Sequence, residues 1–118
     1  MNARVRAVLT DDGGAPFAGI GVIRLLKAID EHGSINHAAK VYGLSYVKAW
    51  NMMNRLEMNT GKAVLKRTSG GQHGGGAVLT PFGKRFLKSF EAYQDRMSRA
   101  AATGMQRFLC DLNKEEDQ

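Results

Sequence analysis

Residues 33–57, "GSINHAAKVYGLSYVKAWNMMNRLE", decide the fold of this chain. Ser34 and Ser45 each precede a helical pattern, and serine is a favourable N-cap because its hydroxyl accepts a backbone N–H of the first turn. Gly43 is expected to end the first of the two helices. The inner face of that helix consists of Ile35, Ala38, Ala39 and Tyr42. Two short helices joined by a short turn containing glycine predict a helix-turn-helix unit.

The second helix of this unit, which we expect to run to about residue 58, has two unlike faces. At about 100° per residue, one arc is apolar and is predicted to be buried. It consists of Ala49, Met52, Met53 and Leu56. The opposite half carries Val47, Lys48, Asn51, Asn54, Arg55 and Met58. We expect Trp50, on one flank, to be partly buried and Tyr46, near the N-terminal tip, to contact a ligand.

A glycine-rich hairpin is predicted after this unit. Two short β-type runs, residues 63–66 and 77–80, flank ten residues that include five glycines. Thr80 or Pro81 then begins a helix, since proline is tolerated in the first turn. Its apolar residues recur at steps of three and four up to Leu109, which allows about thirty residues or roughly 45 Å. The apolar stripe exceeds what a small core covers and predicts a partner helix. The alternative is one bent or broken helix packed on its own domain.

The N-terminal third predicts a strand, a hairpin and a helix. "ARVRAVL", residues 3–9, alternates arginine with apolar residues, which is typical of a strand with one solvent-exposed face. A turn cluster and a short extended piece around Phe17 follow, and a helix is expected from Ile20 to near His32. "GIGVIR" within it begins like a dinucleotide fingerprint, but Arg24 stands at the third glycine position.

These patterns predict a mainly α protein with a small β component, a winged helix-turn-helix with a long C-terminal dimerisation helix. The length of 118 residues fits one domain. Its expected parts are the helix-turn-helix at residues 33–59, the wing at 62–80 and the long helix at 81–110.

Positive charge is concentrated in the middle of the chain. Residues 1–33 have four basic and four acidic side chains, residues 34–88 have nine basic and one acidic, and residues 89–118 have four basic and six acidic. The net charges are therefore 0, +8 and −2, which sum to +6. This is the distribution expected of a protein with a polyanionic partner. The alternative is a solvated basic surface that maintains solubility.

Composition and motifs argue against an enzyme, a metal site and a membrane protein. The sequence contains no phosphate-binding loop, no G-x-S-x-G, no H-E-x-x-H and no C-x-x-C. The three histidines and single cysteine share no metal-ligand spacing, so we expect no metal and no cofactor. No apolar run approaches the roughly 20 residues of a membrane span, and no signal peptide is evident. We expect a cytoplasmic protein.

In a winged helix, the second helix enters the major groove and the wing follows the backbone or minor groove. Cations and amides are the groups that phosphates and base edges require. The predicted DNA-contacting residues of the helix-turn-helix are Ser34, Asn36, Ser45, Tyr46, Lys48, Asn51, Asn54 and Arg55. Those of the wing are Lys66, Arg67, Ser69, Gln72 and His73, for which the alternative is a solvated loop.

The sequence resembles the N-terminal domain of ModE-type molybdate-responsive regulators and is more distantly similar to LysR-type regulators. The resemblance covers about residues 3–110. It rests on residues that occur in the family's order and spacing: Gly33, Ser34, Ile35, Ala38, Ala39, Ser45, Tyr46, Ala49, Trp50, Gly70, Gly71, Gly74, Gly75, Leu79, Thr80 and Gly83. It implies a winged-helix transcription regulator that dimerises through its first and last helices. Members of the family continue into a molybdate-binding module. This chain ends at Gln118, so we expect it to lack that module, and its effector is unknown.

The sequence therefore predicts a sequence-specific DNA-binding transcriptional regulator that acts as a homodimer on double-stranded DNA. The alternative is a winged-helix adaptor that binds protein without reading DNA. Acidic residues on the second helix would favour the adaptor, and Glu57 is the only one present.

Overall fold

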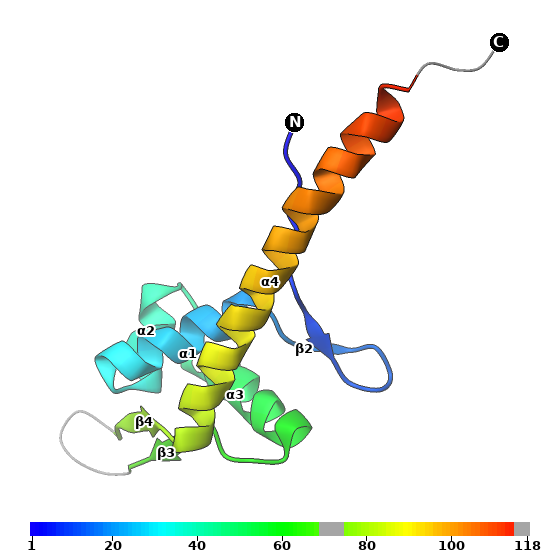
Figure 1. Ribbon diagram of the computed structural model, residues 1–118. Helices are drawn as coiled ribbons and strands as arrows, with labels where there is room; N and C mark the ends of the chain where they lie inside the picture. The colour runs from blue at the N-terminus through cyan, green and yellow to red at the C-terminus, as the bar shows by residue number, and fades with distance from the viewer. Residues whose placement is uncertain (69–74, 115–118) are drawn as a thin grey trace.

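The computed structural model describes residues 1–68 and 75–114. A short hairpin comes first, then three helices, a second hairpin and one long helix (Figure 1). In chain order the elements are β1 (Leu9–Thr10), β2 (Pro16–Ala18), α1 (Ile20–His32), α2 (Ile35–Val41), α3 (Tyr46–Thr60), β3 (Leu65–Arg67), β4 (Ala77–Leu79) and α4 (Pro81–Leu112). The two hairpins form separate two-stranded antiparallel sheets. This order confirms the predicted winged helix-turn-helix.

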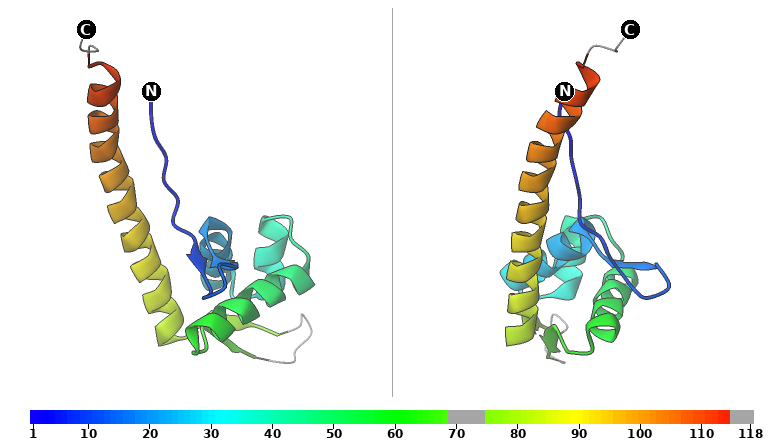
Figure 2. Two further views of the ribbon diagram at one scale, coloured as in Figure 1. Left: turned by 90° about the vertical axis from the view of Figure 1, so that its right-hand side faces the viewer. Right: turned by 45° about the vertical axis from the view of Figure 1, so that its right-hand side comes forward.

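The molecule has a globular end and a long projecting helix. Helices α1, α2 and α3 and the β3–β4 hairpin gather around the first turns of α4, and the remainder of α4 extends away from them (Figures 1 and 2). The N-terminal arm, residues 1–8, runs beside this projecting part. The molecule measures 76 × 28 × 23 Å, much longer than it is wide.

The core lies among α1, α2 and α3. The side chains of Leu25, Leu26 and Ile29 of α1 are fully buried, as are Met53 and Leu56 of α3. Helix α2 contributes the small residues predicted from the sequence: Ala38 and Ala39 are 0% and 1% exposed. Because a methyl group is the whole side chain there, the neighbouring helices approach closely.

A glycine in the left-handed conformation ends α1, and another lies in the turn between α2 and α3. Gly33 has φ 70° and Gly43 has φ 67°, a region that favours glycine because it has no Cβ. The predicted inner position of Tyr42 was wrong, because Tyr42 lies at the C-cap of α2 and is 43% exposed. Leu44 packs against the core in its place, and its N–H donates to the carbonyl of Ala39 at 2.9 Å.

The predicted strand over residues 3–9 was also wrong in its length. Only Leu9 and Thr10 pair with β2, since β2 has three residues and offers no partner further along. The amide of Gln94 on α4 holds the preceding arm instead. Its Oε1 accepts the N–H of Ala7 and its Nε2 donates to the carbonyl of Val5, both at 2.7 Å. One side chain thus replaces a strand partner.

Helix α4 begins at Pro81 and has 32 residues, which confirms its predicted length. Thr80 is the N-cap: its Oγ1 accepts the N–H of Gly83 at 3.0 Å and donates to the carbonyl of Ala63 at 2.7 Å. Only Gly83, Leu87 and Phe90 of α4 are buried. Among the described residues, no helix has the length and apolar character needed to cross a membrane.

An ion pair joins α1 to α4 at the edge of the core. The Nζ of Lys27 lies 2.7 Å from Oε2 of Glu91. The hydrogen bond to Glu91 and its negative charge raise the pKa of Lys27.

Candidate nucleic-acid interface

Helix α3 presents the two faces that the sequence predicts. Ser45 caps it, because the Ser45 hydroxyl accepts the N–H of Lys48 at 3.1 Å. Ala49, Met53 and Leu56 are fully buried, and Met52 is half-buried against the core. The remaining face of α3 therefore points away from the core and is available to a ligand.

The outward face of α3 is cationic and amide-rich. Lys48, Asn51 and Arg55 are exposed, and within the described part of the chain neither cation forms a salt bridge. Val47 is 65% exposed and Tyr46 49% exposed. Unpaired cations and exposed amides are suited to phosphates and base edges, and an exposed valine can contact the methyl group of thymine.

The wing root is joined to α3 by Arg67. Its Nη1 lies 3.4 Å from Oε1 of Glu57, and its Nη2 donates to Oδ1 of Asn54 at 3.2 Å. The guanidinium carbon also lies 5.9 Å from the centre of the Trp50 ring. The sequence predicted partial burial of Trp50, but the ring lies at the surface and is 39% exposed. Two predicted DNA contacts, Asn54 and Arg67, are thus bound to each other.

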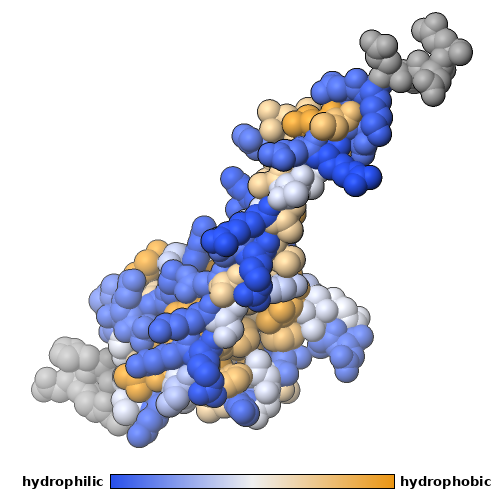
Figure 3. Space-filling view, in the orientation of Figure 1, coloured by the Kyte–Doolittle hydropathy of each residue, from blue (hydrophilic) through white to orange (hydrophobic). Residues whose placement is uncertain are grey.

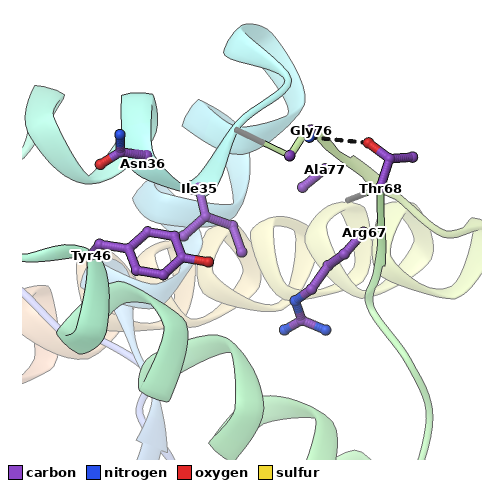
Figure 4. A pocket seen from close by; sticks show the side chains of 8 residues that line it. Ile35, Asn36, Tyr46, Arg67, Thr68, Gly76 and Ala77 are labelled. Carbon is purple, nitrogen blue, oxygen red and sulfur yellow. Dashed lines mark hydrogen bonds between the residues drawn. The ribbon is translucent and has the colours of Figure 1, made fainter. Parts of the chain in front are cut away.

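A cavity of about 350 Å³ lies between the helix-turn-helix and the wing root (Figure 4). Figure 4 shows Tyr46 and Arg67 on facing sides of it, with Asn36 of α2 above Tyr46. Across the wing root, the Thr68 hydroxyl accepts the N–H of Gly76 at 3.0 Å. Its lining includes the Tyr46 hydroxyl and the Asn36 amide, which are groups that can bind a sugar-phosphate backbone.

A second hollow, of about 600 Å³, lies on another side of α3. Lys48, Asn51 and Arg55 line it from α3, and Pro16 and Phe17 line it from β2. The exposed face of α3 is therefore flanked by one hollow at the wing and another at the N-terminal hairpin.

The other predicted contacts lie around this face. The Ser34 hydroxyl caps α2 by accepting the N–H of His37 at 3.1 Å, and Asn36 is exposed. Lys66 is exposed on β3. The predicted contacts Ser69, Gln72 and His73 lie outside the described residues.

Sequence reasoning missed the role of Glu57. Its Oε2 accepts the N–H of Val64 at 2.8 Å and of Leu65 at 3.2 Å, while its Oε1 pairs with Arg67. The carboxylate therefore faces the wing root and not the ligand side of α3. The available signal was that Glu57 is the single acid in a segment with nine basic residues.

Two kinds of comparison define the class of protein. Residues 20–84 match the family described as "Bacterial regulatory helix-turn-helix protein, lysR family". Among solved structures, the DNA complex of the CbnR DNA-binding domain shares the fold, with a TM-score of 0.58 and 24% identity over 74% of this chain and 94% of that one. Fold and family together define a winged helix-turn-helix transcription regulator of the DNA-binding type.

The chain belongs to the lysR family of bacterial regulatory helix-turn-helix proteins. This confirms the prediction of a regulator and not an enzyme.

The predicted resemblance to ModE is confirmed as well. The chain is 41% identical over 81 residues to the molybdenum transport protein ModE of Azotobacter vinelandii, which is 65% of this chain and 30% of that protein. It is 40% identical over 75 residues to the DNA-binding transcriptional dual regulator ModE of Escherichia coli K12, 64% of this chain and 29% of that one. The match thus spans less than a third of either relative's length.

Proposed function

We propose that the chain is a sequence-specific transcription regulator that binds double-stranded DNA as a homodimer. Helix α3 enters the major groove, and the wing follows the backbone or the minor groove. The observation that carries this proposal is the outward face of α3, where Lys48, Asn51 and Arg55 are exposed and both cations are unpaired within the described residues. A major groove about 12 Å wide admits such a helix.

The outward face of α3 offers some groups that can read bases and others that can position the helix on the phosphate backbone. The amide of Asn51 matches the donor and acceptor that adenine presents in the major groove, and Lys48 and Arg55 match guanine or phosphate acceptors. Val47 supplies an apolar contact for thymine. The Tyr46 hydroxyl and the Asn36 amide, which line the cavity at the wing root, suit a sugar-phosphate segment of one strand; such a contact would fix the register of α3 without reading sequence.

The wing adds a backbone contact in this proposal. Lys66 is exposed on β3, which precedes the glycine-rich segment in the sequence. Ser69, Gln72 and His73 are proposed contacts on sequence grounds alone. Glycines permit a close approach of the main chain to a phosphodiester.

The projecting part of α4 supports the homodimer. Beyond Phe90 no residue of α4 is buried, yet Phe108 and Leu112 are apolar and 51% and 58% exposed. Figure 3 shows apolar surface on this part of the helix, bordered by hydrophilic residues. An amphipathic helix that leaves its own core is stabilised when a second helix covers its apolar stripe. A second copy of α4 is the covering element we propose.

The adaptor alternative is weakened by the direction of Glu57. An adaptor that binds a basic partner would present acids on α3, but the Glu57 carboxylate accepts the N–H groups of Val64 and Leu65 at the wing root.

A footprint on the promoter region of the protein's own gene tests the proposal. A homodimer should protect two inverted half-sites about one helical turn, roughly 34 Å, apart. Protection of one asymmetric site would contradict the dimer geometry. Equal protection of every sequence would contradict specific readout.

A further inference from the structure

We propose that Arg67 is a positioning residue: it ties the wing to α3 and fixes the Asn54 amide so that its Nδ2 group faces outward as a donor to DNA. The DNA acceptor is a purine N7 or O6, or a phosphate oxygen. This inference rests on the proposed function, because it names the atom through which the same face of α3 contacts DNA.

The Arg67 guanidinium is occupied within the protein. It contacts Glu57 at 3.4 Å, Asn54 at 3.2 Å and the Trp50 ring at 5.9 Å. All three partners belong to α3. A planar fork with several donors can hold such partners at once. Arg67 therefore connects β3 to one side of α3.

The charge of Arg67 is already balanced by the Glu57 carboxylate. The Arg67 and Glu57 side chains are 33% and 17% exposed, and the carboxylate also accepts two backbone N–H groups at the wing root. A guanidinium already paired with a carboxylate adds little to the neutralisation of a phosphate. Arg67 is thus poorly suited to the phosphate contact that its position in the sequence suggests.

The hydrogen bond from Arg67 fixes the orientation of the Asn54 amide. Arginine has only donors, so the Asn54 atom that faces Arg67 must be the acceptor Oδ1. The opposite end of the amide is then Nδ2. Within the described residues Nδ2 donates to no protein acceptor, and the Asn54 residue is partly exposed to solvent. An Nδ2 group held in this way can donate a hydrogen bond to an acceptor on DNA.

The salt dependence of DNA affinity separates positioning from phosphate contact. We expect Arg67→Gln to weaken binding by about tenfold, the loss expected for one charge-assisted hydrogen bond. The slope of log affinity against log salt should stay at the wild-type value. A slope that becomes shallower by about 0.9, as for one lost phosphate contact, would overturn the proposal. Unchanged affinity would overturn it too.

A double-mutant cycle tests the link to Asn54. If Arg67 acts through Asn54, then Asn54→Ala combined with Arg67→Gln should bind no more weakly than Asn54→Ala alone. Fully additive losses would contradict the link. Titrations with duplexes that differ by one base pair identify the acceptor. Loss of discrimination at one position indicates a purine edge, and uniform weakening indicates a phosphate.

A DNA-independent readout distinguishes this inference from the proposed function. Trp50 is the only tryptophan in the chain, so Arg67→Gln should shift the emission of the free protein as the ring loses its guanidinium neighbour. Unchanged emission would contradict the contact between Arg67 and Trp50, and with it the proposed link between the wing and α3. Failure of the wild-type protein to bind DNA would overturn the proposed function, together with the assignment of DNA as the partner of Asn54. A changed salt slope in Arg67→Gln, with normal wild-type binding, would overturn the inference alone.

Discussion

Replacing Gly83 with alanine should destabilise the junction between the wing and α4. Gly83 is buried in the first turn of α4. A Cβ at this position would lie 2.2 Å from the carbonyl oxygen of Val64, 3.1 Å from its carbonyl carbon and 3.2 Å from its Cα. All three are backbone atoms, so no change of side-chain rotamer relieves the overlap. The Val64 carbonyl is also held in place by the N–H of Thr80 at 3.0 Å.

Two opposing effects determine the magnitude. Overpacking a well-packed site costs about 1–3 kcal/mol, and an overlap with backbone belongs at the upper end of that range. Alanine in place of glycine inside a helix contributes about 1 kcal/mol in the other direction. The expected net loss in the free energy of unfolding is therefore about 2 kcal/mol. For a domain of this size that corresponds to a fall in Tm of roughly 8 °C.

Thermal unfolding followed by circular dichroism measures this loss. Gly21→Ala is the matched control, because a Cβ on Gly21 in α1 meets no atom within 4 Å. That variant should gain about 1 kcal/mol through helix propensity alone. All proteins are compared at one concentration, since the proposed dimerisation would make Tm depend on concentration. A Gly83→Ala protein as stable as Gly21→Ala would refute the close packing of α4 on Val64.

Four further outcomes follow from the structure. Ser45→Ala should lower the free energy of unfolding in urea by about 1 kcal/mol, whereas Ser45→Asp should retain the cap. Lys48→Ala should weaken DNA binding and make the salt slope shallower by about 0.9, and an unchanged slope would remove Lys48 from the phosphate contacts. Phe108→Glu should give a mass near 12.9 kDa in light scattering, whereas the wild-type protein should give twice that value. Glu91→Gln should lower Tm at neutral pH; because Glu91 raises the pKa of Lys27, the difference should be lost on the alkaline side as the pH rises through that elevated pKa.

The helix-turn-helix could be predicted from sequence because its signals are local. The caps Ser34 and Ser45, the turn at Gly43 and the small residues Ala38 and Ala39 each specify structure within a few residues of themselves. The apolar arc of α3 followed from periodicity alone, and so did the length of α4.

The misplaced features depend on contacts between distant parts of the chain. Alternation in residues 3–9 predicted a strand, but Gln94 on α4 binds that segment. No local pattern indicates that a glutamine 87 residues away takes the place of a strand partner. The inward direction of Glu57 is also set from outside its own helix, because its hydrogen-bond partners Val64 and Leu65 lie beyond Gly61. Local periodicity predicts the face of a helix on which a residue lies, but it does not predict which distant group the side chain contacts.

Fluorescence anisotropy with a duplex from the promoter region of the protein's own gene is the most direct test of the proposed function. We predict binding at low salt that weakens steeply as salt increases, with a slope set by the number of phosphates contacted. An excess of unrelated duplex should compete poorly, because in the proposed function the outward face of α3 reads base edges. Absence of binding to that duplex at low salt would contradict the assignment of α3 as a DNA-recognition helix.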